Sequence, residues 1–256
     1  TGQTGMAAGS GRDRRDSGTG KYFAGEQMTL SILGRCPETG MLGGAVTSSS
    51  ICVASRCLFT RSGVGAALSQ NITDPELGQR MLDLLEKGAN STGTFGANEA
   101  VAQVVAEADH IGWRQLVLLD SAGNSAIHTG EKALGIHSSA QGNQCAAAAN
   151  LLANEQVPQA MVTAFEQSSG HLAQRLITAL EAGISAGGEE GPVRSAGVQV
   201  ADRATWPVVD LRVDWDENPI SKLHTIWNEY EPQMADYVTR AFNPEAAPSY
   251  GVPGDE

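Results

Sequence analysis

The chain has 256 residues, of which 41% are hydrophobic and 18% are charged, and its formal net charge is −12. This length can bury a full hydrophobic core, and the composition is ordinary for a folded globular protein. A surface this acidic repels the phosphates of nucleic acids and of anionic membranes, so we expect neither kind of partner. The chain contains no run of about 18 apolar residues, so it predicts no membrane-spanning helix.

The four cysteines, at positions 36, 52, 57 and 145, include no Cys-x-x-Cys pair. That spacing argues against a zinc site, and the five histidines show no ligand spacing, so we predict no metal and no cofactor. Residues 1–27 are rich in Gly, Ser, Thr and Arg and have no apolar stretch typical of a secretory signal. We interpret them as a disordered leader and expect free thiols in a reducing cytoplasm.

The first folded elements are predicted to be strands. Residues 29–35 and 41–48 form a β-hairpin around the turn at 37–40, and 63–69 is a third short apolar run. Asp74 followed by Pro75 is typical of a helix start, and Gly88 ends that helix. Apolar residues at helical spacing between 97 and 108 predict a second helix.

The second half adds a strand pair at 116–120 and 125–129, joined by a turn. Helices are expected at about 143–154, 157–167 and 171–184, then strands at 196–200 and 208–213 and a closing helix at 220–230. Because the strands come in adjacent pairs, the order favours antiparallel sheets with helices on their outer faces over a doubly wound parallel sheet. We expect one folded domain over 28–242 and an irregular tail at 243–256.

Several segments, in order between residue 28 and about 225, resemble the bacterial family called domain of unknown function 1028 (DUF1028). The segments are Met28–Ile32, Arg61–Ala66, Asp74–Pro75, His128–Gly130, Ala140–Asn143 and Asp210–Asp214. That family is grouped with the N-terminal-nucleophile hydrolases. The resemblance therefore implies an α+β fold, namely a four-layer αββα sandwich of two antiparallel sheets flanked by helices.

Two segments depart from the pattern of the family. Residues 48–52 read Ser-Ser-Ser-Ile-Cys where many relatives carry Ser-Lys, and residues 189–195 replace a stretch that often holds Asp, basic residues, Gly and then Gln-Ser. These departures bear on the substrate pocket more than on the fold.

In this hydrolase class the first residue of the mature chain is Thr, Ser or Cys, and its side chain attacks an amide carbonyl. Its own α-amine, with a pKa near 8, takes up the proton. Thr29 fits this role because it opens the first predicted strand, and removal of Met28 would expose its amine. The alternative is that Thr29 is only a β-branched residue at the start of a strand.

Other residues could assist Thr29. A positive side chain would hold down the pKa of the amine. By analogy with a Lys in proteasome-like enzymes, the resemblance implies Arg61, with Arg56 as the alternate, although either arginine could also be a solvated surface residue. Ser48 could orient the amine. Further residues could bind the substrate or donate hydrogen bonds to an oxyanion; these are Gln70, Asn71, His128, Gln141 and Asn143.

Two of these assignments have structural alternatives. Asn143 would equally serve as the N-cap of the predicted helix that follows it, and a lone histidine in a strand, such as His128, is commonly a hydrogen-bonded structural residue. The acidic run at 214–217 lacks the remaining spacing of a calcium loop.

Three functions remain open from the sequence. The first is an enzyme that cleaves a C–N bond of a small amide or ureide through Thr29, as a homodimer or higher homo-oligomer. The second is a non-catalytic binding or scaffold protein of the same fold. The third is a cysteine-dependent hydrolase that uses Cys52 or Cys57, although buried free cysteines usually act as small hydrophobic residues.

Overall fold

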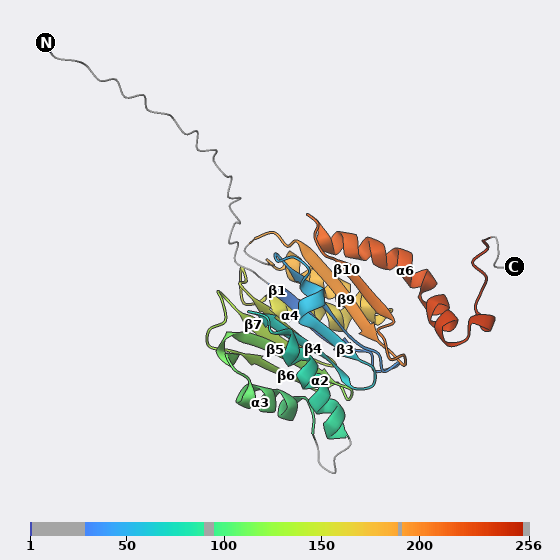
Figure 1. Ribbon diagram of the computed structural model, residues 1–256, viewed down its shortest axis with the longest axis horizontal. Coiled ribbons are helices and arrows are strands. Elements are labelled where there is room, and N and C mark those ends of the chain that lie inside the picture. The colour runs from blue at the N-terminus through green and yellow to red at the C-terminus, as the bar shows by residue number, and fades with distance from the viewer. Residues whose placement is uncertain (2–28, 90–94, 189–190, 253–256) are drawn as a thin grey trace.

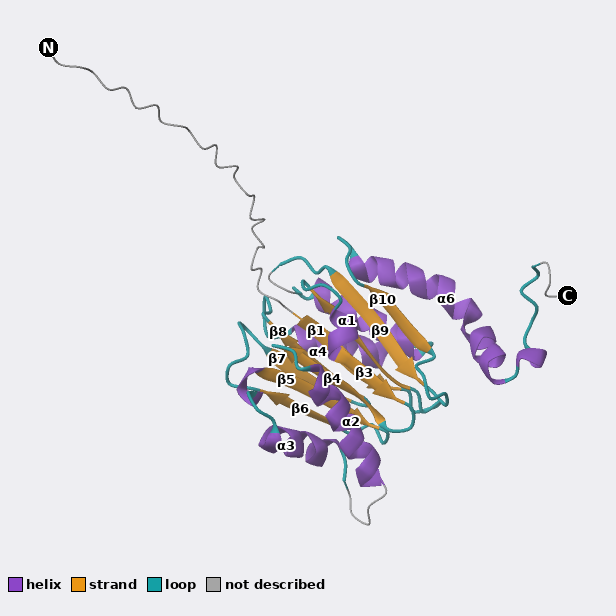
Figure 2. Cartoon of the chain, in the orientation of Figure 1, coloured by secondary structure: helices purple, strands orange, loops and turns teal. Residues whose placement is uncertain are grey.

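The computed structural model describes Thr1 and residues 29–89, 95–188 and 191–252. Beyond Thr1, the predicted leader at 1–27 lies outside the described residues. The described strands form two antiparallel sheets that stack face to face, with helices on both outer sides (Figure 1; Figure 2). Within the described ranges, no helix is both long and apolar enough to cross a membrane.

The larger sheet has the strand order β10-β9-β2-β1-β8-β7. Its strands are β1 (Thr29–Arg35), β2 (Leu42–Ser48), β7 (Ser138–Gly142), β8 (Cys145–Asn150), β9 (Ser195–Ala201) and β10 (Val209–Val213). The central strand β1 pairs antiparallel with β2 on one side and with β8 on the other. At its first residue, Thr29 lies opposite both Ser48 and Asn150.

The smaller sheet has the order β3-β4-β5-β6. Its strands are β3 (Leu58–Arg61), β4 (Gly65–Asn71), β5 (Arg114–Asp120) and β6 (Ser125–Thr129). The short helix α1 (Val53–Cys57) lies between β2 and β3 in the chain and so carries it from one sheet to the other.

Each sheet is covered on its outer face by helices. Helices α4 (Val157–Gln167), α5 (Leu172–Ser185) and α6 (Pro219–Phe242) pack on the larger sheet, and α2 (Pro75–Ala89) and α3 (Ala97–Glu107) pack on the smaller one. Single 3-10 turns occur at Ile111–Trp113 and Pro244–Ala246. The predicted four-layer αββα sandwich is therefore confirmed.

Three apolar clusters fill the three spaces between the layers. Leu30 and Ile32 of β1 belong to the cluster under α4 and α5, whereas Leu33 belongs to the cluster between the two sheets. Because side chains alternate along a strand, Thr29 and Ser31 share the face of Leu33. Their hydroxyls therefore point into the space between the sheets.

Most predicted elements are confirmed, including the first hairpin, the strand pair β5–β6, strands β9 and β10, and all helices except one. The helix predicted at 143–154 is wrong, because residues 145–150 form β8, and the N-cap alternative for Asn143 falls with it. Alanine is the strongest helix former, but here Ala146–Ala149 are fully buried next to the central strand. Their small size lets α4 and the smaller sheet approach closely. The prediction also missed α1, β3 and β7.

This packing can be tested with Ala147→Leu. Ala147 is fully buried in the cluster beneath α4 and α5, so the larger side chain must displace its neighbours. We expect the free energy of unfolding, measured by urea denaturation, to fall by about 1–3 kcal/mol. The matched control is Ser139→Leu on the exposed edge strand β7, which should change stability by no more than about 0.5 kcal/mol. Equal effects of the two substitutions would contradict the packing argument.

Candidate functional site

Thr29 lies in a polar group at one end of the space between the sheets. Its side chain is only 5% exposed, and its cross-strand neighbours Ser48 and Asn150 are fully buried. Residues directly opposite each other in antiparallel strands carry their side chains on the same face, with Cβ atoms about 5 Å apart. The structure therefore brings together two of the predicted catalytic residues, Thr29 and Ser48, and adds Asn150.

A chain of hydroxyl groups leads from Thr29 to an arginine. Thr29 Oγ1 lies 3.5 Å from Ser48 Oγ, which is long for a hydrogen bond between hydroxyls. Ser48 Oγ lies 2.9 Å from Ser50 Oγ, and Arg56 Nη2 donates to Ser50 Oγ at 3.0 Å. Arg56 belongs to α1 and also donates to the carbonyl of Ile51 at 2.9 Å. A positive charge is thus connected to Thr29 through two serine hydroxyls.

The structure does not bring Arg61, the first choice among the basic residues, to Thr29. Arg61 Nη1 forms ion pairs at 2.8 Å with both Asp83 and Glu86 of α2. In the sheet it pairs with Gly65 at the start of β4, whereas Ser31 of β1 contacts Gln70 near the end of that strand. The acidic face of α2 therefore holds Arg61 at the far end of the smaller sheet, and the alternate Arg56 is the arginine linked to Thr29.

Beneath Thr29, a network of polar side chains, most of them fully buried, connects the two sheets. Ser31 Oγ donates to Gln70 Oε1 at 2.6 Å, and Gln70 Nε2 donates to Gln115 Oε1 at 2.8 Å. Asn150 Nδ2 donates to the same Gln115 oxygen at 3.2 Å. Gln115 Nε2 in turn donates to Thr129 Oγ1 at 3.1 Å. The network joins β1 and β8 of the larger sheet to β4, β5 and β6 of the smaller one.

This network gives Gln70 a structural role. Its amide nitrogen has two hydrogens, and they are donated to Gln115 Oε1 and to the carbonyl of Ala148 at 3.2 Å. An oxyanion could gain a hydrogen bond from Gln70 only if one of these bonds broke. The predicted oxyanion role of Gln70 is therefore not supported.

The same network orients Asn150. Because its amide nitrogen donates to Gln115, its Oδ1 is turned away, and this buried oxygen has no hydrogen-bond partner in the described part of the chain. A buried acceptor without a donor lowers the stability of the fold by about 1–3 kcal/mol. An unpartnered oxygen of this kind therefore requires an explanation. Asn150 lies directly opposite Thr29, and a donor placed at Thr29 would remove that cost.

Two more predicted residues belong to the smaller sheet but not to the group around Thr29. Asn71 adopts a left-handed conformation with a φ of 70°, and its amide bonds the carbonyl of Trp113 at 2.6 Å and the N–H of Leu134 at 3.1 Å. It thus ties two loops together. His128 lies opposite Leu116 on the outer face of β6, towards α3. Neither residue faces Thr29.

Gln141 and Asn143 lie at the opposite end of the larger sheet. Gln141 pairs with Ala146 of β8 and donates to Ser125, and the backbone N–H of Asn143 donates to Glu166 at 2.7 Å. Both residues are exposed. The structure therefore does not place them beside Thr29.

The two cysteines proposed as rival nucleophiles, Cys52 and Cys57, have different environments. Cys57 is buried, and burial raises the pKa of its thiol. Cys52 is half-buried at the start of α1 in a left-handed conformation. Cys145 is also buried, and burial, followed by the charge of Glu166, raises its pKa to about 12. A thiol is nucleophilic only as the thiolate, so the structure disfavours Cys57 as a nucleophile.

Cys36, which was not among the predicted site residues, differs from Cys57 and Cys145. Burial raises the pKa of this thiol, but hydrogen bonds from the Thr39 hydroxyl and from the backbone N–H groups of Thr39 and Glu38 outweigh it and leave the pKa lowered. The turn at 37–40, with a threonine three residues after the cysteine, was the signal that could have identified it. Cys36 lies at the end of β1 away from Thr29 and is half-buried.

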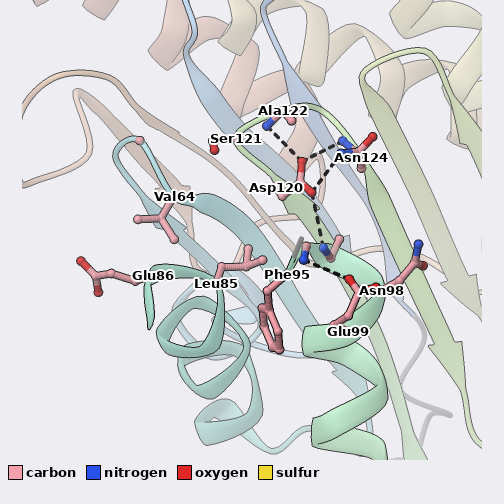
Figure 3. Close-up of a pocket in the computed structure, with 13 residues that line it drawn as sticks. Val64, Leu85, Glu86, Phe95, Asn98, Glu99, Asp120, Ser121, Ala122 and Asn124 are labelled. Carbon is pink, nitrogen blue, oxygen red and sulfur yellow. Dashed lines mark hydrogen bonds between the residues drawn. The ribbon is translucent and has the colours of Figure 1, made fainter. Parts of the chain in front are cut away.

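A cavity of about 520 Å³ lies at the other end of the smaller sheet (Figure 3). Its most buried polar residue is Asp120, which Figure 3 shows between the 121–124 turn and the start of α3. The carboxylate accepts hydrogen bonds from the N–H groups of Ala122 and Asn124 and from Ala97 at the first turn of α3. Asp120 therefore caps both the 121–124 turn and the N-terminus of α3, and this role accounts for its buried carboxylate.

Two stacked antiparallel sheets flanked by helices are the architecture that the family resemblance implies. The chain belongs to the family of unknown function DUF1028, whose sequence pattern matches residues 29–223. It is similar to protein SPO2555 from Silicibacter pomeroyi, a DUF1028 protein of known structure. The identity is 30%, the TM-score is 0.74, and the match covers 82% of this chain and 93% of that one.

More distant likenesses are to Anbu proteins (ancestral beta-subunit). The Yersinia bercovieri protein is 12% identical with a TM-score of 0.34, covering 80% of this chain and 96% of its own. A Gly-1 mutant from Hyphomicrobium is 13% identical with a TM-score of 0.37, covering 82% and 99%. Likenesses this weak support no conclusion about chemistry. No curated protein is significantly similar to the chain in sequence.

The thiol environments predict an order of alkylation. The rate should rise with pH as each thiol ionises, and Cys36, with its lowered pKa, should reach its plateau at a lower pH than an ordinary cysteine. Cys57 and Cys145 should react only at higher pH or after unfolding, because burial raises their pKa values. Iodoacetamide labelling between pH 6 and 9, followed by peptide mass spectrometry, measures this order. Labelling of Cys57 before Cys36 would contradict it.

Proposed function

We propose that the protein is an amide hydrolase that cleaves an amide or ureide C–N bond of a small molecule with Thr29 as the nucleophile. The proposal requires that the peptide bond between Met28 and Thr29 is cut, so that Thr29 gains a free α-amine. The observation that carries it is the position of Thr29 at the start of the central strand, between Ser48 and the unpartnered oxygen of Asn150.

Asn150 would orient the α-amine. The amine must direct its lone pair at Thr29 Oγ1 to act as a base, and one of its N–H groups must then point elsewhere. Asn150 Oδ1 is an acceptor held in a fixed direction by the Gln115 bond, and it lies opposite Thr29. A hydrogen bond from the amine would satisfy the buried oxygen and hold the lone pair in place.

Arg56 would favour ionisation of the Thr29 hydroxyl. A guanidinium can only donate, so Ser50 Oγ accepts from Arg56, and in the proposed mechanism its hydroxyl donates to Ser48 Oγ. This order turns the positive ends of the O–H dipoles towards Thr29 Oγ1. As the Thr29 hydroxyl loses its proton, Ser48 can turn its hydrogen to that oxygen and stabilise the developing negative charge.

The reaction then has two halves. Thr29 Oγ1 attacks the carbonyl carbon while the α-amine takes the hydroxyl proton, which gives a tetrahedral intermediate. The C–N bond breaks, the leaving nitrogen receives the proton from the α-ammonium, and an ester to Thr29 remains. Water, deprotonated by the same amine, attacks the ester and releases the acid with Thr29 restored.

The second candidate is a non-catalytic binding protein of the same fold. It would apply if the bond between residues 28 and 29 stays intact, because Thr29 then has no α-amine and the polar network only joins the sheets. In either case a homodimer or higher homo-oligomer and a cytoplasmic location remain predictions.

The first test asks whether Thr29 reacts as an N-terminal nucleophile. A chain that starts at Met28 exposes Thr29 once methionine aminopeptidase removes the methionine ahead of this small residue. We expect a small β-lactone to acylate this protein once, with the adduct on Thr29 by peptide mass spectrometry, and the protein to hydrolyse at least one compound in a panel of small amides and ureides. Thr29→Ala should lose the adduct and all turnover, and Thr29→Ser should retain both.

Circular dichroism of each variant checks that the fold is intact. Turnover by Thr29→Ala equal to that of the parent protein would exclude Thr29 as the nucleophile. Retention of an unprocessed chain in the producing cell, together with no adduct, would favour the binding protein.

A second test compares the two arginines. Arg56→Met removes the charge that reaches Thr29 through Ser50 and Ser48, so we expect β-lactone acylation of Thr29 to slow by about tenfold, which corresponds to about 1.4 kcal/mol. Arg61→Met is the matched control, because Arg61 pairs with Asp83 and Glu86 on α2, and it should leave the rate unchanged. A larger loss in Arg61→Met than in Arg56→Met would reverse this assignment.

A further inference from the structure

A second cavity lies at the opposite end of β1 from Thr29, where Arg35 ends the strand. Its volume is about 590 Å³, which is within the range of small-molecule sites. We call it the Arg35 cavity. The charged residues that line it are Arg35, Glu38, Glu166 and Arg175. β1 rises about 3.3 Å per residue, so the six steps from Thr29 to Arg35 separate this cavity from Thr29 by about 20 Å.

The four charged residues of the Arg35 cavity do not pair with one another. None of them takes part in an ion pair within 4 Å in the described part of the chain. Two arginines and two glutamates around one cavity would ordinarily neutralise each other. Here other contacts hold them, so charges of both signs line the same space.

The two arginines are fixed by neutral partners. Arg35 Nη1 donates to Gln144 Oε1 at 2.8 Å. Arg175 Nη2 donates to the carbonyl of Phe165 at 3.1 Å, and its guanidinium lies 4.1 Å from the centre of the Phe165 ring. The Nε atoms of both arginines are buried without a hydrogen-bond partner among the described residues. These Nε atoms are closed to a ligand, but each guanidinium has five N–H groups, and the bonds described above use only one of them, which leaves Nη donors for the cavity.

The glutamates are also placed independently of the arginines. Glu166, near the end of α4, accepts a hydrogen bond from the backbone N–H of Asn143 through Oε1 at 2.7 Å. Glu38 is exposed in the turn between β1 and β2. The cavity thus offers carboxylate oxygens on one set of elements and guanidinium N–H groups on another.

We propose that the Arg35 cavity binds a free α-amino acid in its zwitterionic form. The guanidiniums of Arg35 and Arg175 would bind the carboxylate, because their planar N–H groups match its two oxygens. The carboxylates of Glu166 and Glu38 would bind the ammonium group. The two glutamates would repel a ligand that carries only negative charge, and the two arginines would repel one that carries only positive charge. A zwitterion has one group of each sign and can form an attractive contact with both pairs. This site is independent of the chemistry at Thr29.

The test is calorimetric titration of the Thr29→Ala protein, in which no turnover at Thr29 interferes, with each of the twenty common L-amino acids. We expect at least one to bind saturably, with a Kd below about 1 mM. The same compound without its amino group, and the same compound without its carboxylate, should each bind at least tenfold more weakly. Saturable binding of the des-amino acid with equal affinity would show an anion site and overturn the proposal.

Variants locate the binding. Glu166→Gln keeps the oxygen that accepts from the N–H of Asn143 and removes the charge, so the fold should persist while the affinity for the amino acid falls at least tenfold. Arg175→Met should do the same by removing the guanidinium, and Arg61→Met on β3, in the smaller sheet, is the control that keeps full affinity. Binding by none of the twenty amino acids, or unchanged affinity in Glu166→Gln, would overturn the proposal.

Discussion

The candidate site depends on one buried oxygen, Gln115 Oε1, which accepts hydrogen bonds from two amide groups of different sheets. An apolar cluster fills much of the space between the sheets, and an apolar pair of similar shape in place of this contact would give comparable stability. The contribution of the polar network is to fix the positions of the strands and side chains that it joins. Because Gln70 and Asn150 share the same acceptor, the ends of β4 and β8 are registered against each other, and the direction of the Asn150 side chain is fixed.

The sequence predicted most of the strands and helices because periodicity is a local property, whereas the four-layer arrangement was implied by the family resemblance. Alternation over 29–35 and helical spacing over 75–88 each require only neighbouring residues. The network could not be predicted, because Ser31, Gln70, Gln115 and Asn150 lie on four strands far apart in the chain. The alanine run of β8 was misread for a related reason, since tertiary crowding overrides an intrinsic preference that is worth less than 1 kcal/mol per residue.

The site was predicted only in part. Thr29 and Ser48 were selected from the family resemblance and from their places at the ends of the two hairpin strands, and the hairpin places them opposite each other. The choice of Arg61 over Arg56 followed from missing β3, a strand of four residues directly after the five-residue helix α1. Once that helix is recognised, Arg56 lies one turn from the serine run at 48–50 and reaches it directly. The acidic residues of α2, which hold Arg61, are separated from it by more than 20 residues in the sequence.

The Arg35 cavity and the Thr29 site lie at the two ends of the same pair of strands, and this arrangement determines how they could be coupled. β8 begins directly after Gln144, whose side chain holds Arg35, and ends at Asn150. A ligand in the Arg35 cavity that changes only the local charge would have little electrostatic effect at Thr29. The distance of about 20 Å exceeds the length over which salt at physiological concentration screens charges. A ligand that shifts Gln144 along the strand direction would instead move Asn150 relative to Gln115. Coupling between the sites therefore requires two positions of β8, each favoured to a different degree by the ligand. The fully buried alanines of that strand oppose such a displacement, so the structure favours two sites that act independently.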